Sequence, residues 1–266
     1  MEAQERILLE DVFGLTLTDV CGGALEKMSP SDKQKLATLK ARLQKGEPVQ
    51  YVTGKAPFCG RFFHVEPGVL IPRPETEELV DIVISMVNGQ CSTVNGSHPL
   101  NILDIGTGSG CIAISLALQE NTNVTAWDIS ETALAIAGKN AEAMKATVSF
   151  ECQDIFKASC PQEPYWDIII SNPPYICRKE AALMESNVLD HEPHEALFVP
   201  DEEPLLFYEA IGKYAQQGLK QNGLLAFEIN PLYANQLSNT LSDQGFHDIS
   251  IVNDSFGKQR FILCYR

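Results

Sequence analysis

A short polar loop that follows an apolar run is the first part of the sequence able to do chemistry. Residues 167–175 read Asp-Ile-Ile-Ile-Ser-Asn-Pro-Pro-Tyr, so an expected strand ends at Asn172. Asn172 offers a side-chain carbonyl and Pro173 a main-chain carbonyl, while Pro173 and Pro174 stiffen the loop and carry no N–H. Two acceptors on a rigid frame match the two hydrogens of a primary amide or an exocyclic amine. The loop therefore predicts a site for a planar group that bears a nitrogen.

An amide nitrogen is a poor nucleophile because its lone pair is delocalised. Holding both of its N–H groups in line with an electrophile is then the main way to promote a reaction, and no strong base is required. Tyr175 could stack on the flat acceptor and exclude water, or it could be an ordinary core aromatic after a turn. We expect Asn172, Pro173 and Tyr175 to be catalytic, and these three with Pro174 to contact the substrate.

A second strand leads into a loop rich in glycine, at Asp104-Ile105-Gly106-Thr107-Gly108-Ser109-Gly110. Glycine lets the backbone turn tightly and lets a ligand approach without a Cβ in the way. Asp128 ends the next expected strand, 22 positions after Gly106, where a carboxylate could accept hydrogen bonds from ribose hydroxyls. The alternative is a structural glycine turn, with Asp128 only capping the helix that follows.

The spacing of the glycines distinguishes between two cofactors that use such loops. A dinucleotide fingerprint requires its third glycine three positions after the second, where this chain has Cys111. Asp104 could favour the cationic amino acid part of S-adenosylmethionine. We therefore expect S-adenosylmethionine as the cofactor, bound by Asp104, by Asp128 and by the loop residues Gly106, Thr107, Gly108, Ser109 and Gly110.

The elements around these loops alternate between strand and helix, which predicts a parallel sheet covered on both faces. Strands are expected at 101–105, 124–127, 148–150, 166–170 and 224–228, and helices at 111–118 and 130–144. Two closing runs, 249–252 and 260–264, predict an antiparallel pair. The fold class is therefore α/β, a Rossmann-like sheet of the class I S-adenosylmethionine-dependent methyltransferases with an antiparallel C-terminal strand pair.

The N-terminal part of the chain follows a different pattern. Ile7, Leu8, Val12 and Leu15 recur at helical spacing, and a second helix is expected after the N-cap Ser29. That second helix carries one apolar stripe and ends at Gly46; the stripe residues are Leu36, Leu39 and Leu43.

Short runs of aromatic and β-branched residues follow, at 51–53 and 61–65, and they predict a β-hairpin linker. A proline-stiffened segment at 71–77 leads into an amphipathic helix through Val80, Ile84 and Val87. The stretch from 88 to 99 is expected to be a surface loop.

Arg73 lies between two prolines, in a segment expected to cross the mouth of the site. It could contact the substrate, or it could form a local salt bridge with Glu75 or Glu77. The sequence leaves both interpretations open.

Net charge and composition exclude several classes of partner. The formal charge of −15 comes from 35 acidic and 20 basic residues, so the field of the protein repels phosphate backbones, and free nucleic acid is a poor partner. No run of 18 apolar residues occurs, and the first residues lack the layout of a secretory signal. We expect a soluble, cytoplasmic protein that does not bind membranes. The eight cysteines form no C-x-x-C pair, and we expect them to be reduced thiols.

Two histidines and two glutamates lie close together without a metal-binding pattern. His191, Glu192, His194 and Glu195 do not form H-E-x-x-H, and Pro193 interrupts the helix that would place two ligands on one face. Methyl transfer needs no Lewis acid, so we expect no metal.

Taken together, the motifs resemble the HemK/PrmC family of protein-(glutamine-N5) methyltransferases over nearly the whole chain. The tetrad Asn172-Pro173-Pro174-Tyr175 also resembles amino-methyltransferases that act on adenine or guanine in nucleic acids. Three further segments resemble this family's linker, pre-domain segment and post-motif loop, and they lie at 46–51 with Gly54, at 70–77 and at 191–197.

The resemblance implies an enzyme that moves the methyl group of S-adenosylmethionine to the side-chain amide N5 of a glutamine. The glutamine would be that of the Gly-Gly-Gln loop of peptide chain release factors. Asn172 would contact both cofactor and substrate, and a further cofactor contact is implied near Asp154 and Ile155, where the family often has an aromatic residue. The implied domains are a helical substrate-recognition domain at 1–46, a β-hairpin linker at 47–75 and the methyltransferase domain at 76–266.

Two other functions remain as alternatives. The tetrad alone would suit a nucleic-acid amino-methyltransferase, although the negative charge and the lack of a basic recognition region weigh against it. A non-catalytic subunit that only binds S-adenosylmethionine is the other alternative. The intact residues Asp104, Gly106, Asp128 and Asn172 argue against a decayed site.

Overall fold

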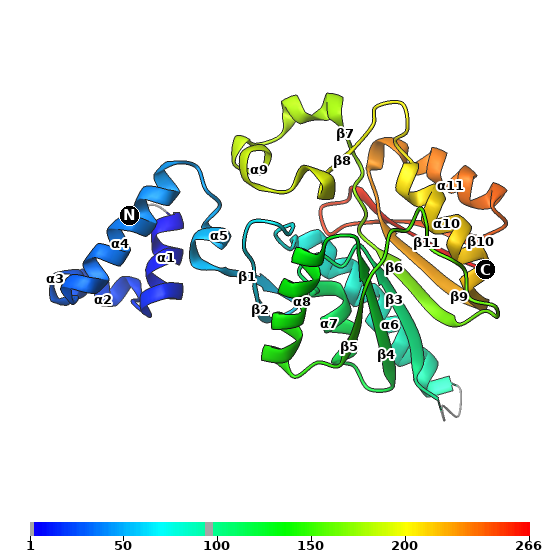
Figure 1. Ribbon diagram of the computed structural model, residues 1–266, viewed down its shortest axis with the longest axis horizontal. Coiled ribbons are helices and arrows are strands. Elements are labelled where there is room, and N and C mark those ends of the chain that lie inside the picture. Colours follow the sequence, from blue (N-terminus) through cyan, green and yellow to red (C-terminus); the bar gives the residue numbers. More distant parts are fainter. Residues whose placement is uncertain (1–2, 94–97) are drawn as a thin grey trace.

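The computed structural model describes residues 3–93 and 98–266, and a seven-stranded mixed sheet lies at its centre (Figure 1). The strand order is β10-β11-β9-β6-β3-β4-β5, in which β9, β6, β3, β4 and β5 run parallel and β11 is antiparallel to both β9 and β10. This arrangement confirms the expected fold class. The strands are β3 (Leu100–Ile105), β4 (Thr122–Asp128), β5 (Val148–Cys152), β6 (Trp166–Ser171), β9 (Leu219–Glu228), β10 (His247–Asn253) and β11 (Gln259–Tyr265).

Helices cover both faces of the sheet because successive strand residues point to opposite sides. Ile102 packs into one hydrophobic core and Leu103 into the other, and both side chains are fully buried. The first core lies under α6 (Pro74–Thr93), α7 (Cys111–Ala117) and α8 (Glu131–Met144). The second lies under α10 (Leu206–Gly218) and α11 (Ala234–Asp243), two helices that the sequence patterns did not predict.

A small helical unit stands to one side of the sheet (Figure 1). It contains α1 (Ala3–Phe13), α2 (Leu17–Cys21), α3 (Ala24–Lys27) and α4 (Pro30–Gln44). The predicted start of α4 is confirmed, because the Ser29 side chain accepts a hydrogen bond from the Asp32 N–H at 3.0 Å and Pro30 opens the helix. Leu36 and Leu39 pack with Leu8 and Leu9 in a core of their own.

The linker differs in part from the sequence prediction. The run 51–53 was expected to be extended, but it forms one turn of helix, α5 (Val49–Thr53), which ends at Gly54 with a φ of +72°. A helical turn sends Tyr51 into a cluster beside the sheet and Val52 into the core of the helical unit, and this packing overrides the β-branched preference. The hairpin itself is present, as β1 (Lys55–Phe58) and β2 (Arg61–His64).

The surface loop expected at 88–99 was also wrong in part. Helix α6 continues to Thr93, and residues 94–97 lie outside the described residues. Lengthening a helix that already exists costs little, because the unfavourable step is nucleation, so weak helix formers can be included in its last turns.

A cap of short elements, at 176–199, covers the carboxyl end of the parallel strands (Figure 1). A two-residue strand at the start of the cap pairs in parallel with a two-residue strand at its end, so the two ends of the cap lie side by side. Its elements are β7 (Ile176–Cys177), η1 (Arg178–Leu183), α9 (Ser186–His191), η2 (His194–Ala196) and β8 (Phe198–Val199), and η3 (Pro231–Tyr233) follows β9. In the described ranges, no helix is long and apolar enough to cross a membrane.

Gly110 is the N-cap of α7 and packs against Ala137 of α8. Its φ is +81°, and a Cβ there would lie 2.9 Å from Ile114 Cδ1 and 3.0 Å from Ala137 Cβ. Both the backbone conformation and the lack of space therefore require glycine at this position.

We predict that Gly110→Ala lowers the free energy of unfolding by about 1 to 3 kcal/mol, through overpacking and backbone strain. Gly138→Ala in α8 is the matched control, because a Cβ at Gly138 meets no other atom within 4 Å and alanine suits a helix interior. Urea unfolding of both variants checks this. Equal stabilities would contradict it.

Candidate active site

A cavity of about 330 Å³ opens at the carboxyl ends of β3, β4 and β6. The strand order reverses at β3, since the chain continues to β4 on one side and to β6 on the other, and open α/β sheets bind ligands at such a point. The loops after the three strands contribute to its wall, with Gly106 and Gly108 after β3, Asp128 after β4, and Asn172 after β6.

The glycine loop presents bare backbone to this cavity. Gly106 and Gly108 have φ angles of +77° and +55°, and a Cβ on either would have no other atom within 4 Å. The N–H groups of Gly106 and Thr107 donate to the Trp127 carbonyl at 2.8 and 2.9 Å, which fixes the loop on the end of β4. The space in front of the two glycines is therefore open to a ligand.

Asp128, at the end of β4, binds the glycine loop through its side chain and lines the cavity. Its Oδ2 accepts a hydrogen bond from the Gly108 N–H at 2.8 Å, and its Oδ1 accepts one from the Ser130 N–H at 2.9 Å. Burial raises the pKa of Asp128, and these backbone donors oppose that effect. Ser130, whose hydroxyl accepts from the Ala133 N–H, is the N-cap of α8, so Asp128 has no such capping role.

Asp104 lies beneath the loop and does not contribute to the cavity wall. It is fully buried, and its Oδ2 accepts hydrogen bonds from the Thr107 hydroxyl at 2.7 Å and the Ala113 N–H at 3.2 Å. Its Oδ1 has no partner among the described residues. Burial raises the pKa of Asp104 to about 7. This carboxyl group therefore ties the start of the loop to α7 and titrates near neutrality.

Asp154 and Ile155, after β5, also line the cavity. The Asp154 carboxylate pairs with Lys157 at 2.9 Å, and that hydrogen bond lowers its pKa. Two aromatic residues line this wall, Phe156, one position after Ile155, and Phe207 in α10, with their ring centroids 5.1 Å apart. Phe156 was recognisable from its place beside Ile155, whereas Phe207 carries no local signal.

The acceptor loop has Asn172, Pro173 and Pro174 on the cavity wall, but not Tyr175. The Tyr175 ring packs against the core under α10 and α11, and its hydroxyl donates to Glu228 Oε1 at 2.9 Å. The Asn172 amide Nδ2 donates to the Thr76 hydroxyl at 3.1 Å.

Arg73 pairs with Glu192, not with Glu75 or Glu77. Its Nη2 lies 2.6 Å from Glu192 Oε1, and Glu192 Oε2 accepts the Ile71 N–H at 3.0 Å. Glu192 is buried, so the cap holds the segment before α6 in place. Gly68, Val69 and Leu70 of that segment form a further part of the cavity wall.

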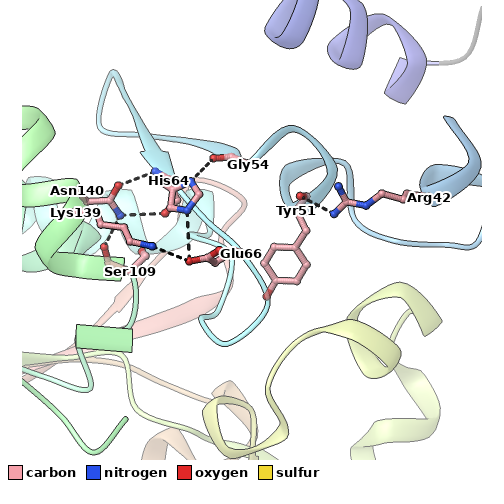
Figure 2. A network of polar contacts seen from close by, with 8 residues as sticks. All are labelled: Arg42, Tyr51, Gly54, His64, Glu66, Ser109, Lys139 and Asn140. Carbon is pink, nitrogen blue, oxygen red and sulfur yellow. Dashed lines mark hydrogen bonds and ion pairs between the residues drawn. The ribbon is translucent and has the colours of Figure 1, made fainter. Parts of the chain in front are cut away.

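Asn140 in α8 joins the linker hairpin to the glycine loop, as Figure 2 shows. Its Oδ1 accepts the His64 N–H at 2.7 Å, and its Nδ2 donates to the carbonyls of His64 and Ser109 at 3.0 and 2.9 Å. Tyr51 makes a second link between the linker and the site, because its hydroxyl donates to the carbonyl of Val69, a residue of the cavity wall. The sequence contained no signal for Asn140, since it stands apart from every motif.

Thr107, Ser109 and Gly110 complete the loop without lining the cavity. The Thr107 and Ser109 side chains are buried, and the Ser109 hydroxyl has no partner among the described residues. Across residues 3–93 and 98–266, no cluster of histidine, cysteine and carboxylate side chains is suited to a metal ion.

Comparison with protein families gives two matches. Residues 2–54 match the PrmC N-terminal domain, and residues 91–194 match the Methyltransferase small domain.

Full-length relatives show which family this is. The release factor glutamine methyltransferase of Bacteroides thetaiotaomicron is 44% identical over 267 residues, which cover 100% of this chain and 93% of the relative. The chain belongs to the release factor glutamine methyltransferase family. The family member of Flavobacterium psychrophilum is 39% identical, over 96% of this chain and 88% of its own length.

Solved structures agree with the fold at low sequence identity. A methyltransferase from Pyrococcus furiosus superposes with a TM-score of 0.54 at 17% identity, over 86% of this chain and 98% of its own. The T. thermophilus 16S rRNA methyltransferase in complex with AdoMet and guanosine gives 0.57 at 17% identity, over 80% of this chain and 49% of its own. Both show the methyltransferase fold.

The buried Asp104 gives a prediction on stability. Its folded-state pKa lies above the unfolded value of 3.8, so the folded state holds more protons between the two values. Its stabilising contribution is present below about pH 4 and is lost as pH rises through about pH 7.

Asp104→Asn keeps the acceptor for Thr107 and cannot ionise. We expect the wild type to lose stability relative to this variant between about pH 4 and pH 7, on the order of a few kcal/mol. Urea unfolding of both proteins across that range measures the difference. Parallel curves would show that Asp104 is not responsible.

Proposed function

We propose that the protein transfers the methyl group of S-adenosylmethionine to the side-chain amide nitrogen of the glutamine in the Gly-Gly-Gln loop of release factors. The observation that carries this proposal is that the glycine loop and the Asn-Pro-Pro loop line one cavity. Membership of the release factor glutamine methyltransferase family supports the choice of substrate.

The residues of the cavity suit S-adenosylmethionine. Gly106 and Gly108 leave space that a Cβ would fill, Asp128 offers carboxylate oxygens for ribose hydroxyls, and Ile155 with Phe156 provides an apolar face for a base. We propose these as cofactor contacts, together with Asn172 and Asp154. The remaining loop residues Thr107, Ser109 and Gly110 do not line the cavity, and we propose that they support the cofactor by shaping the loop. Asp104 would act from beneath the loop, by holding it. S-adenosylmethionine supplies an electrophilic methyl group on a positively charged sulfur, which becomes a neutral thioether when the methyl group leaves.

The acceptor loop would hold the substrate amide. Asn172 Oδ1 and the Pro173 carbonyl accept no hydrogen bond from any described residue, so both can accept the two N–H groups of a glutamine side chain. As the nitrogen forms its bond to the methyl carbon, the bond from that carbon to sulfur would break, and one N–H proton would pass to water. Pro174 stiffens the loop. The Tyr175 ring packs in the core rather than on the cavity wall, so instead of the expected stacking on the substrate we propose that Tyr175 supports the acceptor loop from behind.

The parts outside the sheet would bind the release factor. We propose the helical unit at 1–46 as the recognition domain, 47–75 as the linker and 76–266 as the methyltransferase domain. We also propose that Arg73 contacts the substrate. Its side chain pairs with Glu192 but is still 30% exposed.

The net charge of −15 disfavours a free nucleic acid substrate, so only the Asn172-Pro173-Pro174-Tyr175 tetrad favours a nucleic-acid amino-methyltransferase, and we propose the release factor instead. Because release factors act in translation, we also propose that the reaction takes place in the cytoplasm.

A labelling experiment tests the substrate. The protein would be incubated with methyl-labelled S-adenosylmethionine and an unmodified release factor, beside the same factor with its loop glutamine changed to alanine. Label on the first factor alone is the expected result. Label on both, or on neither despite cofactor binding, would refute the proposed substrate.

Two variants should separate cofactor binding from transfer. Asp128→Asn removes the charge from an acceptor of hydrogen bonds, so we expect S-adenosylmethionine affinity to fall by ~10- to 100-fold. Asn172→Ala removes an amide acceptor, so we expect transfer to fall by at least ~100-fold while cofactor binding is largely kept. Calorimetry and the labelling rate measure the two effects. A similar loss of both quantities in both variants would contradict the assignment.

A further inference from the structure

A buried carboxylate stands behind the acceptor loop. Glu228 ends β9, is 1% exposed and does not line the cavity. Its Oε2 accepts a hydrogen bond from the Thr76 hydroxyl at 2.6 Å, and its Oε1 accepts one from the Tyr175 hydroxyl at 2.9 Å. Burial raises the pKa of Glu228, while these two bonds and the positive charge of Arg260 oppose that effect.

The chemistry of these groups fixes the direction of a hydrogen-bond chain. The Thr76 hydroxyl donates its single proton to Glu228, and in its ionised form the Glu228 carboxylate can only accept it. The Thr76 oxygen is then free to accept, and it takes the hydrogen bond from Asn172 Nδ2 at 3.1 Å. The amide nitrogen of Asn172 is committed to Thr76, which leaves Oδ1 as the group available to the cavity.

We propose that Glu228 is a positioning residue that acts through Thr76 to set the orientation of the Asn172 amide. This inference rests on the proposed function, in which Asn172 Oδ1 accepts an N–H of the substrate amide. An asparagine amide turned by 180° has nearly the same shape but presents a donor, and a donor facing the N–H groups of a substrate would repel them. Shape alone does not prevent that turn.

Variants of Thr76 test the chain directly. Thr76→Val keeps the shape and removes the hydroxyl, so we expect kcat to fall by at least ~10-fold with the KM for S-adenosylmethionine unchanged. Thr76→Ser restores the hydroxyl and should recover most of the loss. Tyr208→Phe is the control, because Tyr208 donates to the main-chain carbonyl of the same Glu228 at 3.0 Å and should leave kcat unchanged.

A double-mutant cycle tests whether Glu228 acts through Thr76. Thr76 and Tyr175 donate to different oxygens of Glu228, and a glutamine presents an NH₂ donor in place of one of them. With the oxygen serving Tyr175, the NH₂ group faces the Thr76 hydroxyl and reverses that bond, so Glu228→Gln should lower kcat. In the Thr76→Val background the glutamine oxygen can serve Tyr175, so the second substitution should cause no further loss. Losses that multiply, or Thr76→Val with wild-type kcat, would overturn the proposal.

An NMR measurement separates this inference from the proposed function. Protein labelled with ¹⁵N at asparagine gives a side-chain NH₂ signal for Asn172, which an Asn172→Ser variant identifies. We expect this NH₂ group to be protected from exchange in the wild type and unprotected in Thr76→Val. If protection were equal in both, the positioning role would be wrong; if release factors were not labelled while protection differed, only the proposed substrate would be wrong.

Discussion

The reversal of strand order at β3 is the constraint on which the other features of the site depend. Because the chain leaves β3 toward β4 on one side and later returns to β6 on the other, the loops after these strands diverge and leave a space between them. The glycine loop, Asp128 and Asn172 meet at this space although 66 positions separate the first glycine from the asparagine. A regular parallel sheet thus supplies the geometry, and the loops supply the chemistry.

Buried polar side chains then hold the loops in place. Asn140 fixes the glycine loop to the hairpin, Glu192 fixes the segment before α6 to the cap, and Glu228 lies behind the acceptor loop. Each of these groups is almost fully buried, so loss of a partner would leave an unsatisfied polar atom in the interior. The same bonds that attach the linker to the sheet therefore also shape the cavity wall, which makes the N-terminal region part of the site's support.

The sequence was sufficient for the sheet and for the two principal loops, because apolar strands end directly in their motif residues and parallel strands bring those ends to one edge. It failed where the deciding contact lies far away in the chain. For Arg73 the sequence left open a substrate contact or a salt bridge with a glutamate two or four positions on, whereas its ion-pair partner, Glu192, is 119 positions away. Thr76 and Glu228, 152 positions apart, carry no periodic signal, and the helical turn at 51–53 places Tyr51 and Val52 in two separate cores whose other members lie elsewhere in the chain.

The wall of the cavity is assembled from distant parts of the chain, from Gly68 before the sheet to Ile211 in α10. During synthesis from the N-terminus, the segment 68–70 is made long before the cap that anchors it through Glu192, so the wall is complete only after most of the chain has been translated. A ligand in this cavity can bind only the finished fold. Occupancy therefore stabilises the whole native state, by an amount that grows with the ligand concentration relative to Kd, and protects it against unfolding and proteolysis.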